Sequence, residues 1–224
     1  MNKIVHQIYG IFDDGIPIED IPVFKNCSET TRSYCKAHNI EYKMWDLKSC
    51  EELIIENFPE YIELWNDFRY PIQRADFIRY CILYKFGGLY LDCDIVPVRN
   101  ISSIFDESQY FVYWANDNKK LPYNAVMGTN SDNKLFLEIM KQCQKDYYEK
   151  SKNKTYEKWR GRFIFQTTGH HMLERVMKKQ NIDKDKYFHD DLYVHNDNKK
   201  CSVGDCCQAK FYDSNASVWY NNLI

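Results

Sequence analysis

The segment FGGLYLDCDIV at residues 86–96 constrains the fold of this chain more than any other. It opens with two consecutive glycines, in a chain that has only eight, and glycine lets the backbone turn sharply without side-chain bulk. The apolar run Leu89 to Leu91 follows directly and predicts a short buried strand. Asp92 and Asp94 then place two charges where that strand leaves the core. The segment therefore predicts a sharp turn, a strand and a polar site at the strand's carboxyl end.

A strong helix pattern leads into this segment. Pro71 fits the first position of a helix that runs to Phe86, and apolar residues recur along it at helical spacing. Asp76 and Arg79 lie three positions apart, so they share one face, next to the apolar stripe and outside it. Such a helix would bring an acid and a base to a strand end that carries two more acids, which indicates a polar ligand site. An ordinary helix ion pair of little energetic value is the alternative.

Strand and helix patterns alternate along the rest of the chain, which predicts an α/β fold with a central, mostly parallel sheet. The expected strands cover residues 3–9, 41–46, 89–91, 110–115, 124–128 and 187–195. The expected helices cover residues 26–39, 49–57 (opened by a capping box of Ser49 and Glu52), a short stretch from Pro59, 71–86, 132–148 and 168–180. The polar stretch 149–162 is expected to be a loop or lid. No internal repeat divides the chain, so we expect a single domain over residues 1–224.

Composition argues against several classes of protein. The net charge of −2 gives no general reason for binding nucleic acid, and no stretch approaches the roughly 20 apolar residues that span a bilayer. The first residues lack the anatomy of a signal peptide. Nine scattered cysteines, several in apolar patterns, indicate buried free thiols rather than a disulfide framework. We therefore expect a cytoplasmic chain, and peripheral contact with the inner face of the membrane stays open.

The chemistry of the two aspartates depends on their spacing. Positions i and i+2 of a strand point to the same side, so both carboxylates could face the place where open α/β sheets bind ligands. Like charges so close repel, so one carboxyl takes up a proton unless a cation lies between them. Hard divalent ions favour carboxylate oxygens and share them with substrate phosphates. A simple turn or helix cap after an edge strand is the alternative.

The segment RADFIRYCILYKFGGLYLDCDI strongly resembles the D-x-D sugar-binding segment of glycosyltransferase family 32. The relatives in that family include fungal α-mannosyltransferases, capsular and lipopolysaccharide glycosyltransferases and, more distantly, the glucosyltransferase domains of large clostridial toxins. The stretches KIVHQIYG, YKMWD, NAVMGT and TTGHHML resemble other family segments. The positions that match the central pattern are Ala75, Asp76, Arg79, Leu83, Phe86, Gly87, Gly88, Tyr90, Asp92 and Asp94.

This resemblance implies a GT-A fold, in which a Rossmann-like sheet carries a nucleotide sugar and a divalent metal, usually Mn²⁺, with Mg²⁺ as the alternative. It implies that Asp94 binds the metal and that Asp92 contacts the metal through water, or the ribose and sugar. The implied catalytic residues are Asp92, Asp94 and Arg79, and the implied metal ligands are Asp94, Asp92 and Ser217. The implied donor-binding residues are Ile8, Tyr9, Asp76, Arg79, Tyr90, Asp92, Asn124 and Trp219.

Two segments depart from the family pattern. His170 replaces the proline of a T-G-P segment, and it could touch phosphate or acceptor together with His171, or be a surface group at a helix start. The carboxyl-terminal DSNASVW fits the family's S-x-W, but the slot of a metal-binding glutamate falls on Ser214, with Asp213 adjacent. The basic stretch 150–162 carries six Lys and Arg residues and a tryptophan. It could approach an anionic acceptor or a membrane surface, or be a solvated loop.

The expected function is a metal-dependent, retaining transfer of a hexose from a nucleotide sugar to a hydroxyl of a glycan or glycolipid. A UDP-sugar is the preferred donor and GDP-mannose the alternative. A glycoside hydrolase would need two carboxyls that flank the scissile bond. A carbohydrate-binding or metal-binding module without turnover would need more oxygen ligands for Ca²⁺ than this segment offers.

Overall fold

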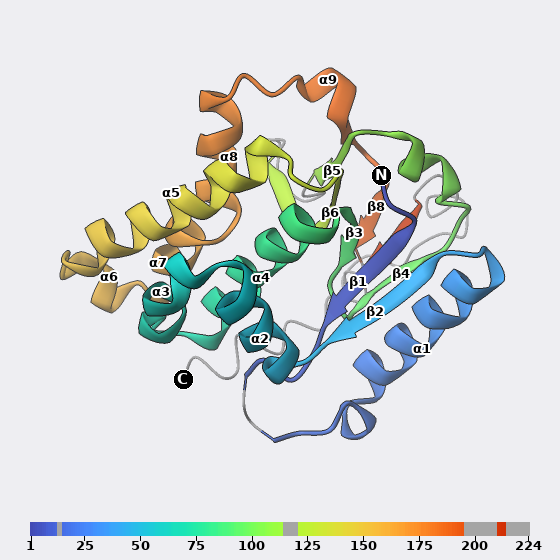
Figure 1. Ribbon diagram of the computed structural model, residues 1–224, viewed down its shortest axis with the longest axis horizontal. Helices are drawn as coiled ribbons and strands as arrows, with labels where there is room; N and C mark the ends of the chain where they lie inside the picture. The colour runs from blue at the N-terminus through green and yellow to red at the C-terminus, as the bar shows by residue number, and fades with distance from the viewer. Residues whose placement is uncertain (13–14, 114–120, 195–209, 214–224) are drawn as a thin grey trace.

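A mixed six-stranded sheet forms the centre of the computed structural model, which describes residues 1–12, 15–113, 121–194 and 210–213 (Figure 1). Its order is β2 (Glu41–Trp45), β1 (Ile4–Ile8), β3 (Gly88–Leu91), β6 (Pro122–Thr129), β5 (Gln109–Tyr113) and β7 (Phe188–His189). β1 runs parallel to β2 and β3, and β5 runs parallel to β7. β6 runs antiparallel to both of its neighbours.

A small second sheet consists of three short strands. They are β4 (Ile95–Pro97), β9 (Phe211–Asp213) and β8 (Leu192–Val194), with β9 in the middle. β9 is antiparallel to β4 and parallel to β8. Because β4 follows the D-x-D segment directly, this sheet joins residues near the end of the described chain to the centre of the sequence.

Helices and the small sheet cover the two faces of the central sheet. Figure 1 shows α1 beside β2 on one side and most other helices on the opposite side. The alternating side chains of β3 show the division: Leu89 and Leu91 belong to the apolar cluster on the α1 side, and Tyr90 belongs to the larger cluster under the other helices. The helices are α1 (Pro22–Ala37), α2 (Leu47–Asn57), α3 (Ile62–Asp67), α4 (Pro71–Phe86), α5 (Lys134–Ser151), α6 (Thr155–Lys158), α7 (Arg160–Thr167), α8 (His170–Lys179) and α9 (Lys184–Tyr187).

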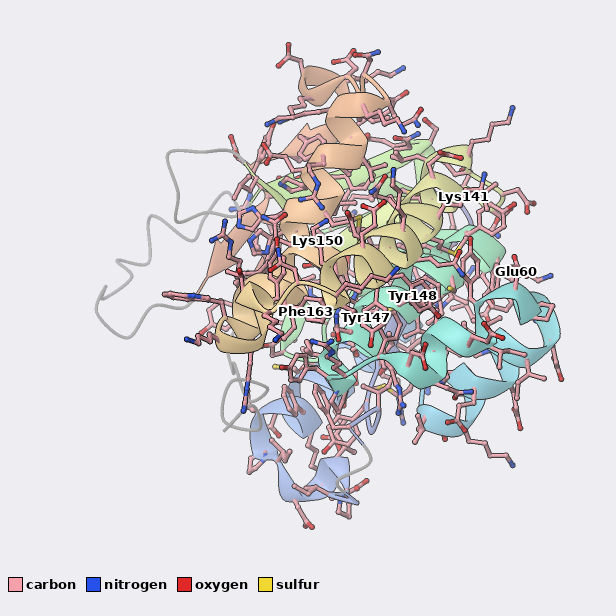
Figure 2. All side chains as sticks on the ribbon, turned by 90° about the vertical axis from the view of Figure 1, so that its left-hand side faces the viewer. Glu60, Lys141, Tyr147, Tyr148, Lys150 and Phe163 are labelled. Atoms are coloured by element: carbon pink, nitrogen blue, oxygen red, sulfur yellow. The ribbon has the colours of Figure 1, made fainter. Side chains whose placement is uncertain are left out.

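Two local predictions are wrong. The second helix is capped by Asp46, whose carboxylate accepts from the Ser49 backbone N–H at 2.8 Å, so it begins two residues before the expected Ser49 cap. The stretch 149–162 is largely helical rather than a loop, because α5 extends to Ser151 and α6 and α7 follow. Figure 2 shows why α7 is held there: its Phe163 packs against Tyr147 of α5, with ring centroids 5.8 Å apart.

The glycine pair is required by the geometry between α4 and β3. Gly87 and Gly88 have φ angles of 64° and 85°, in the region that side chains disfavour. A β-carbon on Gly87 would lie 2.7 Å from the backbone nitrogen of Ser131, and one on Gly88 would lie 2.6 Å from the carbonyl oxygen of Ile4. The pair therefore permits both the turn and the close approach of β3 to β1.

The cysteines agree with the prediction of free thiols within the described residues. No disulfide forms among Cys27, Cys35, Cys50, Cys81, Cys93 and Cys143, which are all buried. The remaining cysteines, Cys201, Cys206 and Cys207, lie outside the described residues. In the described ranges, no helix is long and apolar enough to cross a membrane.

His6 gives the fold a testable dependence on pH. Its Nδ1 accepts from the Trp45 indole N–H at 3.2 Å, so Nε2 carries the proton and donates to the Gly87 carbonyl at 3.0 Å. Burial lowers the pKa of His6 to about 4. Histidine in the unfolded chain has a pKa of about 6.5, so below that pH the unfolded chain binds more protons than the folded chain. The contribution of His6 to the unfolding free energy is therefore lost as the pH falls.

We expect wild-type protein to lose about 2 kcal/mol more unfolding free energy than His6→Gln when the pH falls from about 6.5 to about 5. Urea unfolding of both proteins at the two pH values measures this difference. Each protein serves as its own reference at the higher pH, so a general destabilisation by the substitution cancels. Equal losses in the two proteins would show that His6 does not titrate between its folded and unfolded states.

Candidate active site

The helix α4 is buried on more sides than its sequence pattern predicted. Asp76 and Arg79 were expected beside the apolar stripe, yet they are only 5% and 3% exposed. All residues from Ala75 to Leu83 are buried, because α4 lies between the central sheet and the helices α5 and α7. The burial of both side chains argues against the alternative of an ordinary helix ion pair. A buried charged pair persists only when each charge has partners, so these partners define the site.

Arg79 is the cation at the centre of the site. Its Nη2 lies 3.2 Å from Asp76 Oδ1, and its Nη1 lies 3.1 Å from Asp92 Oδ1. Nη1 also donates to the Asn124 carbonyl at 2.9 Å, and the guanidinium lies 4.9 Å from the centre of the Tyr90 ring. Burial alone would lower the pKa of Arg79, but the surrounding carboxylates outweigh it and raise the pKa further. One guanidinium thus joins α4, β6 and the end of β3.

Asp76 has both of its oxygens engaged. Besides Arg79, Oδ1 accepts from the Asn124 amide at 2.9 Å, and Oδ2 accepts from the Thr168 hydroxyl at 2.9 Å. Burial raises the pKa of Asp76 to about 6, although Arg79 and the Thr168 hydroxyl oppose the rise. Thr168 was not among the predicted site residues. Its signal in the sequence is the TTG triplet that precedes the two histidines.

The segment that carries Asp92 and Asp94 is a turn and not part of the strand. β3 ends at Leu91, and the Ile95 N–H donates to the Asp92 carbonyl at 3.0 Å, which closes the turn. The expectation that strand alternation puts both carboxylates on one side therefore rested on the wrong local structure. Asp92 accepts from the Tyr90 hydroxyl at 2.6 Å through Oδ1, which also faces Arg79. Its side chain is 31% exposed, so the carboxylate connects the buried cluster to solvent.

A third carboxylate comes to this turn from the far end of the described chain. Asp213 of β9 pairs in register with Ile95, directly after Asp94, and its side chain is fully buried. Its Oδ2 accepts from the Tyr123 hydroxyl at 3.1 Å. Burial, then Asp213, Asp92 and Asp94, raise the pKa of Tyr123 well above its usual range. Three carboxylates therefore oppose ionisation of the Tyr123 hydroxyl. The predicted Ser217 and Trp219 lie outside the described residues.

The remaining predicted residues lie around this cluster. Ile8 ends β1, and its carbonyl accepts from the Cys93 thiol at 2.9 Å, which ties β1 to the turn. Tyr9 is half-buried and packs against Phe24 with ring centroids 5.8 Å apart. The structure thus places Asp76, Arg79, Tyr90, Asp92 and Asn124 in one network, with Asp94 and Ile8 beside it. His170 begins α8, and its ring centroid lies 4.4 Å from that of His171.

The donor atoms at the turn suit a hard divalent cation. They are carboxylate oxygens, which Mg²⁺ and Mn²⁺ prefer to thiolates or imidazoles. Within the described residues, no three acidic, histidine or cysteine side chains converge closely enough to hold a metal ion by themselves. A cation at this turn would have to take one or two carboxylates from the protein and its other oxygens from substrate phosphates and water.

Comparison with known proteins identifies the segment that builds this site. A family model described as a glycosyltransferase sugar-binding region containing a DXD motif matches residues 17–111, which include α4, the glycine pair and the turn. This segment of the chain is therefore similar to DXD glycosyltransferases. An uncharacterized glycosyltransferase of Acanthamoeba polyphaga mimivirus is 31% identical over 141 residues, which cover 62% of this chain and 54% of the relative.

Two further comparisons are informative. Inositol phosphoceramide mannosyltransferase 3 of Schizosaccharomyces pombe is 29% identical over 140 residues, or 62% of this chain and 36% of that protein. This chain therefore spans about half or less of the length of its curated relatives. The solved structure of PaToxG glycosyltransferase superposes with a TM-score of 0.56 at 13% identity, over 83% of this chain and 72% of that one. The expected GT-A type of fold is confirmed.

Proposed function

We propose that this chain transfers a hexose from a nucleotide sugar to a hydroxyl of a glycan or glycolipid acceptor. The observation that carries the proposal is the cluster of the buried Asp76, Arg79 and Asn124 with the half-buried Asp92, at the carboxyl ends of β1 and β3. Ligands of open α/β sheets bind at this end, and a carboxylate, a guanidinium and an amide together can accept from and donate to sugar hydroxyls. The cost of burying these charges is consistent with a functional site rather than a stabilising one.

Each residue of the cluster has a distinct role in this proposal. Arg79 and the Tyr90 hydroxyl fix Oδ1 of Asp92, while Oδ2 of Asp92 accepts no hydrogen bond in the described part of the chain. That oxygen is available to a ligand or to a water molecule. Asp76 has both oxygens engaged, so it is suited to orient sugar hydroxyls and unsuited to act as a nucleophile. We therefore propose transfer with retention on the face of the leaving diphosphate, as the family resemblance implies.

A divalent metal, Mn²⁺ or Mg²⁺, would be held by Asp94 with Asp92, and Ser217 is the third proposed ligand. When bound, such an ion stabilises the negative charge that develops on a leaving diphosphate. Other residues supply the remaining features of the proposal. Ile8 and Tyr9 frame the base, Tyr90 and Asn124 line the sugar pocket, and Trp219 is proposed to contact the diphosphate.

We propose a UDP-sugar as the donor. GDP-mannose is the second candidate, because two relatives are named as mannosyltransferase or mannosyl phosphorylinositol ceramide synthase. A glycan or glycolipid acceptor fits either donor. Polysaccharide biosynthesis in the cytoplasm, with peripheral contact at the inner face of the membrane, is the proposed setting.

The expected result of a donor screen is release of UDP or GDP only when Mn²⁺ is present. Purified protein is incubated with UDP-glucose, UDP-galactose, UDP-N-acetylglucosamine or GDP-mannose, and the released nucleotide is measured by chromatography. EDTA should stop the release, and added Mn²⁺ should restore it, because the ion offsets the charge of the diphosphate. Cleavage of a glycoside that persists in EDTA would favour a hydrolase. Binding of every donor without turnover would favour a binding module.

A further inference from the structure

A cavity of about 480 Å³ opens beside the cluster, on the side of α7 and α8. Its lining residues are Trp159, Arg162, Phe165, Gln166 and His171. This volume falls within the range of ligand pockets, roughly 300 to 1,000 Å³. None of the proposed donor or metal residues lines it, so it is a separate feature of the surface.

The cavity lies close to the sugar-binding cluster along the chain. Thr168, which donates to Asp76, and Gly169 separate the lining residues Gln166 and His171 along the chain. A β-carbon on Gly169 would lie 3.1 Å from the Phe165 backbone and 3.6 Å from Asp76 Oδ2. A molecule in the cavity would therefore sit near the side of the cluster that holds Asp76.

The side chains around the cavity favour an anionic ligand. Arg162 makes no hydrogen bond or ion pair within the described residues, so its guanidinium is available at the rim. The Gln166 carbonyl oxygen accepts from Arg175, which leaves the amide N–H groups of Gln166 for a ligand. His171 adds an imidazole, and none of the five lining residues is acidic. Guanidinium and amide donors in this arrangement match the oxygens of a phosphate.

Trp159 adds a flat apolar surface to these donors. It is 63% exposed, more than any other large apolar side chain in the described part of the chain. Its indole, which lines the cavity together with Phe165, offers an apolar face to a ring. A ligand that covers this face would remove apolar surface from water. The elements that carry it are well held, because α7 packs on α5 through Phe163 and Tyr147, as Figure 2 shows.

We propose that this cavity is the acceptor subsite, and that it binds a phosphorylated sugar or cyclic polyol whose ring stacks on Trp159 and whose phosphate faces Arg162. The role as acceptor subsite rests on the proposed transferase function. A soluble sugar phosphate and a lipid headgroup are the two sources of such a phosphate, since both present a polyol ring and the same anion.

Isothermal titration calorimetry tests the binding directly and without a donor. Glucose 6-phosphate is titrated into wild-type protein, and glucose and inorganic phosphate are titrated separately. We expect glucose 6-phosphate to bind more tightly than either part alone. Trp159→Ala and Arg162→Ala should each weaken it by about tenfold or more, since each removes one of the two proposed contacts. Lys152→Ala removes a cation of the same basic stretch outside the cavity and should bind like wild type.

Vesicles distinguish the two sources of the ligand. Binding to phosphatidylcholine vesicles that contain phosphatidylinositol, and not to vesicles that contain phosphatidylserine, indicates a lipid headgroup. Binding of glucose 6-phosphate alone indicates a soluble ligand. Equal binding to both anionic vesicles, no binding of any probe, or unchanged binding in Trp159→Ala and Arg162→Ala would overturn the proposal. Failure of wild-type protein to bind any nucleotide sugar would contradict the transferase proposal alone, because the sugar-phosphate titrations contain no donor.

Discussion

Asp94→Asn is expected to lower Mn²⁺-dependent hydrolysis of the nucleotide sugar by about a hundredfold to a thousandfold. The substitution keeps the size of the side chain and removes the charge that is proposed to hold the metal. Asp94 is half-buried in the turn between β3 and β4, so its replacement by an isosteric residue should leave the fold intact. Steady-state kinetics over a range of Mn²⁺ concentrations measures the effect, and a raised Mn²⁺ requirement would accompany the loss.

The matched control for this variant is Asp106→Asn. Asp106 is exposed and ends a short 3₁₀ helix away from the turn, so the same chemical change there should leave both the rate and the Mn²⁺ requirement unchanged. Thermal unfolding of both variants shows whether the fold is kept. Full activity in a folded Asp94→Asn protein would remove Asp94 from the metal site, and with it the proposed means of stabilising the diphosphate.

Arg79→Met is expected to lower the unfolding free energy by about 3 to 5 kcal/mol. The methionine fills much of the same space but leaves Asp76 and Asp92 without the cation that lies within 3.2 Å of both. Uncompensated carboxylates in a buried site are costly, because the protein interior solvates them poorly. Urea denaturation of wild-type and variant protein gives the difference. Donor binding should be lost as well, since Arg79 holds Asp92 in place.

The chain offers a close control for this prediction. Lys141 and Glu138 form an ion pair with the same spacing of three residues at 2.9 Å, but their side chains are 54% and 37% exposed. Lys141→Met should therefore cost less than about 1 kcal/mol. A second variant, Asp76→Asn combined with Arg79→Met, removes one unpaired charge and should recover part of the loss. An Arg79→Met protein as stable as wild type would contradict the assignment of Arg79 as the central cation.

The parts of the fold and site that the sequence predicted are those with strong local signals. Pro71 and the glycine pair bound α4 as expected, because proline favours a first helical turn and glycine tolerates positive φ. The family resemblance identified five residues that the structure joins in one network. Local sequence signals and the long segment that resembles the family were therefore enough to predict the helix, the turn into β3 and the centre of the site.

The parts that the sequence did not predict depend on contacts between distant segments. Thr168 reaches Asp76 across 92 positions, and Asp213 reaches Tyr123 across 90. No spacing rule relates such pairs. The resemblance implied catalytic and donor-binding roles for Arg79, but not its position between two carboxylates, where it is the local counter-charge. The helices in the polar stretch 149–162 form because the buried Phe163 packs on α5. The many charged residues of that stretch hide this packing signal in the sequence.

The position of β9 bears on the order in which a newly made chain assembles. β4 has its only described strand partner in residues 211–213, whereas the central sheet is complete by residue 189. A ribosome-bound chain can therefore form its central sheet while the strand after Asp94 still exposes an open edge, since contacts of long sequence separation close late. In the nascent protein the turn that carries Asp94 would lack its strand partner until Asp213 emerges. The central sheet would therefore form before the site is complete.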